Sequence, residues 1–316
     1  MFDPNIPVYT SEILTNEILA KLKTDYAQYD EAYVFNACID ERRLVLDQAY
    51  YICKDYLDDD FANEICIPGK FISRIWELAL CSIFLHKGYT LEKRIRTNKK
   101  ARPDFCILID EKKIWVEAVC PSLGEVDPVP PPPILVPGVI HSETLDIAAD
   151  IRPRALSASS AFIGKVAKRE KYLKGGLMKE NEPLIIAVNT YQITRHSDTM
   201  VDELLLYGMG LHQMTQDGVW SRQYIPEIKK MTEKGEVLVP MAYFLREEYK
   251  SISGAIFFSK WFEFEIDWRD TMADSAITYF NSGTSLPVEK KHITFGRRRY
   301  AEATSGYIEL KDFTAH

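Results

Sequence analysis

The chain contains 316 residues, of which 46% are hydrophobic and 27% are charged. This composition is typical of a globular protein with a sizeable core, and it excludes collagen-like, coiled-coil and disordered chains. The net charge of −7 argues weakly against nucleic acid as a partner, although the charge is distributed unevenly along the chain.

The sequence has no basic and apolar leader, and no apolar run reaches the roughly 18 residues of a membrane-spanning helix. We therefore expect a cytoplasmic protein that does not contact a membrane. The cysteines form no CxxC pair and no Cys/His cluster, so we expect buried, reduced thiols: Cys38, Cys53, Cys66, Cys81, Cys106 and Cys120.

The first 68 residues predict an extension of two or three helices, with Thr10 or Ser11 as the first cap. This extension is acidic, because residues 1–68 carry 5 Lys/Arg against 14 Asp/Glu. Residues 69–120 are basic, with 11 Lys/Arg against 6 Asp/Glu. A nucleic-acid partner would therefore approach the second segment rather than the first.

A helix is predicted over residues 71–88, where apolar residues recur at helical spacing and Gly88 supplies the end. Glu77 lies on this helix. Residues 89–95 predict a first strand. The segment Glu92–Asp104, EKRIRTNKKARPD, is dense in lysine and arginine, which is typical of a phosphate-binding loop but also of an ordinary solvated loop.

Two acidic residues follow on what the sequence predicts to be a hairpin. Asp104 comes after a proline and opens the apolar run FCILI; residues 110–113 form a polar turn; Glu117 lies within the returning strand IWVEAVC. Burying a carboxylate in such a strand is costly unless it is paired or coordinated. We therefore expect Asp104 and Glu117 to converge on one metal ion, although Asp104 could instead cap or pair with Arg102.

Downstream, residues 128–137 contain VPPPPILVP and predict an extended, polyproline-like loop. Residues 152–174 predict one helix, and the apolar run PLIIAVNT from Pro183 is typical of a strand buried on both faces. The predicted order from Glu77 onward is thus helix, three strands, helix, strand. This order indicates an α/β protein with a mixed central sheet flanked by helices.

Residues 200–316 give weaker signals. They predict a helix at MVDELLLYGM, a buried strand at SGAIFFSKW, and a strand at ITYF that leads into a loop from Asn281 to Pro287. The acidic FEFEIDW is either an outer strand of the same sheet or part of a substrate-recognition lobe. The basic FGRRRY at 295–300 is either a nucleic-acid contact or an exposed turn. We expect a helical extension over 1–68, an α/β core over 69–199, and a C-terminal extension over 200–316 that packs on the core.

The segment from about residue 69 to residue 190 resembles the PD-(D/E)xK nuclease superfamily. The resemblance lies in Glu77 on a helix, Pro103-Asp104 at the start of the second strand, and Glu117-Ala118-Val119 at the end of the third. It implies a restriction-endonuclease-like core of order αβββαβ. The chain departs from the family pattern at Val119, which stands where the motif has lysine.

Some members of the superfamily carry this lysine on the helix that follows the third strand. Here that helix offers Lys165, Lys168 and Lys171. Helical spacing places Lys165 on the flank of the apolar stripe, from which it can extend to the sheet edge, whereas Lys168 and Lys171 are expected to face solvent. Lys165 is therefore the expected catalytic lysine, with Arg154 and Arg169 as reserve candidates.

The resemblance implies Mg²⁺ as cofactor, with Mn²⁺ as a substitute. Asp104, Glu117 and the backbone carbonyl of Ala118 would hold the ion, and Glu77 would reach it directly or through a water. A divalent cation lowers the pKa of bound water and neutralises charge on a phosphodiester, which is why this chemistry needs hard oxygen ligands. The implied partner is nucleic acid, with DNA favoured over RNA.

Three functions remain open from the sequence. The first is a metal-dependent nuclease in which Asp104, Glu117, Glu77 and Lys165 act together. The second is a catalytically degenerate nuclease fold that binds nucleic acid or protein, which Val119 favours. The third is a metal-free hydrolase that uses Cys120, with His141 as its base, or Glu77. The oligomeric state is also open, with a dimer among the options.

Overall fold

The computed structural model describes eight stretches of the chain: 1–94, 102–122, 147–193, 200–214, 220–232, 235–261, 268–304 and 307–313. Three predicted features lie largely or wholly outside these stretches, namely the densest part of the basic segment, the polyproline-like loop and FEFEIDW. Within the described residues, no helix is both long and apolar enough to cross a membrane.

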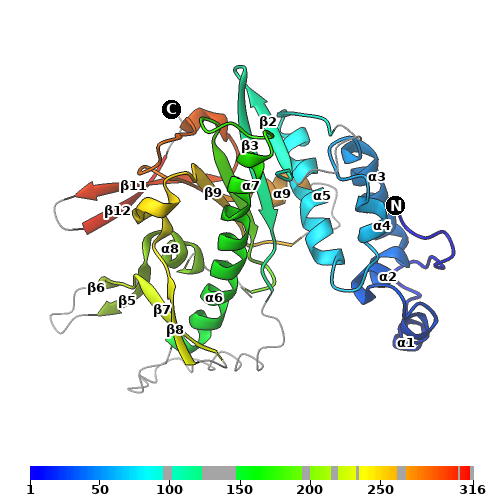
Figure 1. The fold of residues 1–316 in the computed structure, drawn as a ribbon. Coiled ribbons are helices and arrows are strands. Elements are labelled where there is room, and N and C mark those ends of the chain that lie inside the picture. Colours follow the sequence, from blue (N-terminus) through cyan, green and yellow to red (C-terminus); the bar gives the residue numbers. More distant parts are fainter. Residues whose placement is uncertain are drawn as a thin grey trace.

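The protein is a mixed α/β fold built on a large mixed sheet with helices on both faces (Figure 1). The sheet has the strand order β1-β2-β3-β4-β9-β10-β11-β12. Its strands are β1 Thr90–Leu91, β2 Phe105–Ile109, β3 Lys112–Val119, β4 Leu184–Asn189, β9 Gly254–Phe258, β10 Ile277–Phe280, β11 Arg297–Thr304 and β12 Tyr307–Asp312. Residues from both sides of position 199 therefore contribute strands to one sheet.

Strand β2 runs antiparallel to both of its neighbours, β1 and β3. Strands β3, β4 and β9 are mutually parallel, β10 is antiparallel to β9, β11 is parallel to β10, and β12 is antiparallel to β11. Every residue of β4 and β9 is buried, as the sequence predicted from their continuous apolar runs.

One face of the sheet packs against α5 (Phe71–His86), α9 (Trp268–Asp274) and the N-terminal helices. The other face packs against α6 (Ile147–Val166), α7 (Lys168–Lys174) and α8 (Met200–Tyr207). Alternate residues of β3 divide between the two cores, since Val116 belongs to the α5 side and Trp115 to the α6 side. The two layers are visible on either side of the sheet in Figure 1.

The N-terminal residues are helical, as predicted, but they form four helices instead of two or three: α1 Asn16–Asp25, α2 Glu31–Ala37, α3 Asp40–Cys53 and α4 Phe61–Glu64. The predicted cap at Thr10 or Ser11 was wrong. The first helix is capped by Thr15, whose hydroxyl accepts from the Ile18 N–H. Tyr9, just before the predicted cap, forms an isolated parallel bridge with Ile39 instead of leading into a helix.

The predicted helix over 71–88 corresponds to α5, which is followed by Gly88 at a positive φ of 81°. The predicted first strand is shorter than expected, since β1 covers Thr90–Leu91 only. The helix predicted over 152–174 begins earlier and is divided, because α6 ends at Val166 and α7 begins at Lys168.

The C-terminal part adds features that the sequence did not predict. Two small two-stranded sheets pair β5 (Met209–Met214) with β6 (Trp220–Tyr224), and β7 (Glu227–Thr232) with β8 (Gly235–Pro240). Of the two interpretations of residues 295–300, the exposed turn was wrong, because Arg297 to Tyr300 form the first half of β11 and pair with β10. Helix α8 and strand β10 lie where the sequence predicted them.

Candidate functional site

The β2–β3 hairpin brings Asp104 and Glu117 together. Its connection is a two-residue turn in which Asp110 and Glu111 have positive φ values of 50° and 63°. Phe105 pairs with Val116, so the same register extended by one residue places Asp104 opposite Glu117. Residues opposite each other across an antiparallel pair point to the same face, and here that face is the one covered by α6 and α7.

Lys165, in the last turn of α6, extends its side chain between the two carboxylates. Its Nζ lies 2.9 Å from Asp104 Oδ2 and 2.7 Å from Glu117 Oε2. The site is largely closed to solvent, since the side chains of Lys165 and Asp104 are 15% and 12% exposed and that of Glu117 is fully buried. The two acids therefore converge on one cationic point.

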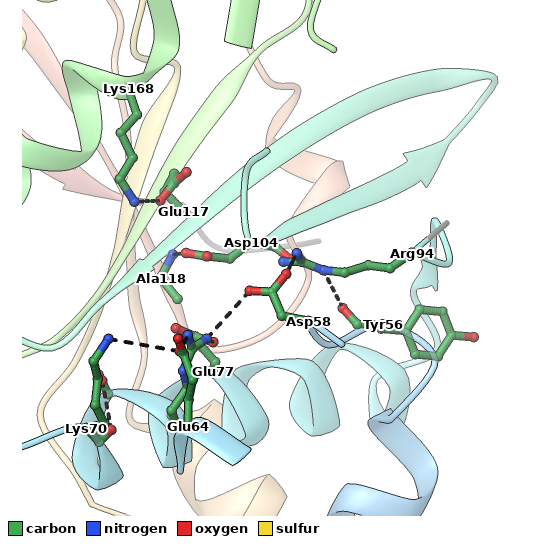
Figure 2. Close-up of polar contacts among 12 residues, drawn as sticks. Tyr56, Asp58, Glu64, Lys70, Glu77, Arg94, Asp104, Glu117, Ala118 and Lys168 are labelled. Atoms are coloured by element: carbon green, nitrogen blue, oxygen red, sulfur yellow. Dashed lines mark hydrogen bonds and ion pairs between the residues drawn. The ribbon is translucent and has the colours of Figure 1, made fainter. Parts of the chain in front are cut away.

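Tyr172 and Lys168 contact Glu117 from α7. The buried Tyr172 hydroxyl donates a hydrogen bond to Glu117 Oε1. Lys168 Nζ lies 3.6 Å from Glu117 Oε2, and its side chain is 42% exposed (Figure 2). Lys168 was expected to face solvent, and its side chain is partly exposed, but its ammonium also contacts Glu117. Ala167 keeps helical backbone angles, so Lys168 lies three residues after Lys165 on a neighbouring position of the helix surface.

Glu77 approaches from the opposite layer. It lies on α5, below Asp104 in the view of Figure 2, and its Oε2 accepts a hydrogen bond of 2.6 Å from Arg74. Arg74 also forms ion pairs with Glu64 and, at 3.6 Å, with Asp58. Glu77 is thus part of an ion-pair network that includes two acids from the N-terminal extension.

Arg94 fixes the backbone at the start of β2. One guanidinium nitrogen donates to the backbone carbonyl of Asp104 at 2.7 Å, and another forms an ion pair with Asp58. A third donates to the Tyr56 carbonyl at 3.1 Å. This buried side chain therefore connects the N-terminal extension to the residue that opens the hairpin. Burial lowers the pKa of Arg94 to about 10, against the opposing charge of Asp104.

The local charges set different protonation tendencies for the three acids. Burial raises the pKa of Glu77 to about 7 and that of Glu117 to about 6, and in both cases the negative charge of Asp104 adds to the effect. Burial alone would also raise the pKa of Asp104, but the charge and hydrogen bond of Lys165 outweigh burial and hold it below its ordinary value.

Burial alone would lower the pKa of Lys165, but the charges of Asp104 and Glu117 outweigh burial and raise it. Lys165 is therefore an ammonium ion at neutral pH. Two carboxylates carry one more charge than a single ammonium can balance. The ammonium of Lys168 offsets part of this excess, and the raised pKa of Glu117 lets that acid take up a proton more readily than an ordinary glutamate.

The donor set suits a hard divalent cation. Mg²⁺ is commonly held by one or two carboxylates, with waters and substrate oxygens completing its octahedron. Among the described residues no group of three His, Cys, Asp or Glu forms a metal cluster. Two acids converge, however, and Glu117 Oε2 is a buried oxygen that faces the Lys165 ammonium at 2.7 Å. The Lys165 ammonium lies between the two carboxylates that would hold such a cation.

Ala118 contributes its backbone. Its N–H donates to Asp104 Oδ2 at 2.7 Å, which was not expected from the sequence. In an extended strand the N–H and C=O of one residue point to the same edge, so the Ala118 carbonyl also faces the Asp104 side. This orientation is compatible with the expected carbonyl ligand.

The Cys120 alternative has little support. Burial raises the pKa of Cys120 to about 12, so the thiol is protonated at neutral pH, whereas a nucleophilic cysteine needs to be a thiolate. Its Sγ lies 3.8 Å from the side-chain oxygen of Gln192. The base proposed for it, His141, lies outside the described residues.

Sequence reasoning missed three contributors to the site: Tyr172, Arg94 and the Arg74 network. Tyr172 carried a signal that could have been used, because it lies two helical turns after Lys165 and therefore on nearly the same side of a helix. Arg94 gave no such signal, since its partner Asp58 is far away in the sequence. Arg74 gave a local one, because it lies three residues before Glu77 on the same helix, a spacing that favours an ion pair.

Comparisons with protein-family models, with curated proteins and with solved structures each found no match to this chain.

Proposed function

We propose that the protein is a metal-dependent nuclease of the PD-(D/E)xK type in which the motif lysine has moved to α6. The observation that carries the proposal is the position of the Lys165 ammonium, 2.9 Å from Asp104 and 2.7 Å from Glu117. In this proposal Lys165 supplies the ammonium group that is missing at Val119, the position where the family motif has its lysine.

The element order supports a restriction-endonuclease-like core. Helix α5, strands β1 to β3, helix α6 and strand β4 follow one another as αβββαβ. The first three strands are antiparallel neighbours, and β4 pairs in parallel with β3. In this proposal Glu77 comes from the first helix of the core, Asp104 and Glu117 from the second and third strands, and Lys165 from the second helix.

Asp104 and Glu117 would hold Mg²⁺ or Mn²⁺, together with the Ala118 carbonyl, and Glu77 would contribute directly or through a water. The bound cation would neutralise charge on a phosphodiester and lower the pKa of a water. Lys165, as a permanent cation, would donate hydrogen bonds to the scissile phosphate and to the attacking water. It is unsuited to remove a proton, because the neighbouring carboxylates raise its pKa.

Lys168 supports an anionic substrate. Its side chain is 42% exposed and its ammonium lies beside the buried Glu117, where it can contact a neighbouring phosphate. Nucleic acid fits this arrangement of buried acids behind an exposed cation, and we propose DNA as its substrate.

A catalytically degenerate binding module is the second candidate, and one observation favours it. Glu117 is already engaged by Tyr172, Lys165 and Lys168, so the acids have partners without a metal ion. In this case Asp104 and Glu117 would form a structural ion cluster, and removal of divalent cations would leave nucleic-acid binding unchanged.

Cleavage of supercoiled plasmid and of single-stranded DNA tests the two candidates. The wild type, Asp104→Asn, Glu117→Gln and Lys165→Ala are compared with Glu111→Gln, which makes the same acid-to-amide change at the exposed turn of the same hairpin. A nuclease would be active in Mg²⁺, inactive in EDTA and inactive in the three site variants only. DNA binding without cleavage by the wild type in either Mg²⁺ or Mn²⁺ would select the degenerate module.

A further inference from the structure

Tyr172 is a buried residue of α7 whose ring packs in the core between α6, α7 and the sheet. Its hydroxyl donates a hydrogen bond to Glu117 Oε1. A tyrosine that only filled space in this core would not need a polar atom aimed at a carboxylate, because phenylalanine would pack there equally well.

The two oxygens of Glu117 have different surroundings. Oε1 accepts from Tyr172, whereas Oε2 faces the ammonium groups of Lys165 at 2.7 Å and Lys168 at 3.6 Å. The hydroxyl therefore fixes the rotation of the carboxylate, so that Oε2 is the oxygen directed at Asp104 and at the shared cationic point.

We propose that Tyr172 is a positioning residue for the metal ligand Glu117: because its hydroxyl occupies Oε1, the oxygen that faces Lys165, Oε2, is the one that would bind a divalent cation. This inference rests on the proposed nuclease function and assigns a role that the acidic motif does not include. Outer contacts of this kind orient ligating carboxylates, and their loss typically weakens metal affinity or activity by about 10- to 100-fold.

Tyr243 provides a matched control. It is also fully buried, and its hydroxyl is hydrogen-bonded at 2.6 Å to Ser159 on α6, with its ring stacked on Phe162. Both Tyr172→Phe and Tyr243→Phe remove one buried hydroxyl and keep the ring. Only Tyr172→Phe removes a contact to Glu117.

The test is a titration of Mn²⁺ into the full-length wild type and the two variants, followed by electron paramagnetic resonance of the free ion, with thermal unfolding in EDTA as a check on folding. We expect Tyr172→Phe to bind Mn²⁺ about 10- to 100-fold more weakly and Tyr243→Phe to bind it like the wild type. Raising the Mn²⁺ concentration should restore cleavage to Tyr172→Phe but not to Lys165→Ala, because only the first variant keeps the catalytic lysine.

The outcomes separate this inference from the function on which it rests. Equal Mn²⁺ affinity of Tyr172→Phe and the wild type would overturn the role of Tyr172 and leave the nuclease proposal intact. Equal weakening in both tyrosine variants would also overturn it, because the effect would then come from the core. Absence of Mn²⁺ binding by the wild type would overturn the proposed function and, with it, this inference.

Discussion

The Lys165 ammonium lies 2.9 Å from Asp104 Oδ2, although 61 positions separate the two residues in the chain. The same nitrogen lies 2.7 Å from Glu117. Two carboxylates buried side by side repel each other and lose their hydration, so this arrangement is tolerable only with a cation between them. In our account the cation is Lys165 in the metal-free protein, and a divalent ion shares the same acids during catalysis.

The first prediction concerns Lys165→Met. Without the ammonium, Asp104 and Glu117 are left as uncompensated buried charges, and we expect the free energy of unfolding in EDTA to fall by about 3 to 5 kcal/mol. Millimolar Mg²⁺ should restore part of the lost free energy of unfolding, because the bound ion neutralises the two carboxylates. Cleavage should stay absent. Urea denaturation with and without Mg²⁺ measures this effect.

Lys171→Met is the control for that experiment, because Lys171 lies on the exposed side of α7. It should unfold like the wild type in both conditions. Retention of full cleavage by Lys165→Met, or loss of cleavage in Lys171→Met, would show that the catalytic lysine has been assigned to the wrong residue.

The second prediction concerns the hairpin turn. Asp110 and Glu111 both adopt positive φ, a conformation that costs a glutamate energy and suits Asn-Gly. The double variant Asp110→Asn/Glu111→Gly should therefore raise the free energy of unfolding by about 1 kcal/mol and leave cleavage unchanged. Inserting one residue into β3 before Glu117 should instead abolish cleavage, because a shift of one residue turns Glu117 to the α5 face.

Arg94 gives the third prediction. Its guanidinium is largely buried and bonded to the Asp104 carbonyl and to Asp58, so Arg94→Met should cost about 2 kcal/mol or more of unfolding free energy. The neighbouring Lys93→Met is the control, because Lys93 is 66% exposed and pairs with Asp55 at the surface. Equal unfolding midpoints for the two variants in a thermal melt would contradict a structural link through Arg94.

The fourth prediction is a pH dependence that arises away from the site. Asp202 is buried beside Tyr279, whose hydroxyl donates to it at 2.7 Å, and burial raises the pKa of Asp202 to about 8. Between pH 4 and pH 8 the folded protein keeps this proton and the unfolded chain releases it. Stability should therefore decrease as the pH rises through this range, by up to about 1.4 kcal/mol per pH unit from this group.

Asp202→Asn should remove that part of the pH dependence. The free energy of unfolding of Asp202→Asn, relative to that of the wild type, should therefore increase from pH 5 to pH 8. Asp25→Asn, at the exposed end of α1, is the control and should follow the wild type. Parallel curves of unfolding free energy against pH for Asp202→Asn and the wild type would show that Asp202 ionises normally in the folded protein.

Much of the fold could be predicted because the signals were local. The apolar periodicity of α5 and the continuous apolar runs of β4 and β9 depend on nearby residues, and each element lies where it was expected. The hairpins β5–β6 and β7–β8 were missed. In β8, for example, the apolar residues Val237 and Leu238 follow one another directly, and both are exposed in the structure. The strand therefore lacks the alternation of apolar and polar residues by which a strand is recognised in a sequence.

The candidate site shows the same difference between local features, which could be predicted, and contacts between distant residues, which could not. Asp104 and Glu117 could be paired from the sequence because a short hairpin fixes their register, and Lys165 could be ranked above Lys168 from helical phase. The contact of Lys168 with Glu117 was missed because helical phase was judged against the apolar stripe alone, although Lys168 lies three residues after Lys165 and therefore on a neighbouring position of the helix surface. Arg94 and Arg74 depend on acids from the N-terminal extension, which only the tertiary structure brings near.

The most direct test of the central claim is isothermal titration of Mn²⁺ into the wild type and into the Asp104→Asn/Glu117→Gln double variant, both purified in EDTA and then freed of it. Our account predicts saturable binding to the wild type and none to the double variant, whose amides cannot neutralise the ion. Absence of binding to the wild type, or equal binding to both proteins, would contradict a metal site at Asp104 and Glu117.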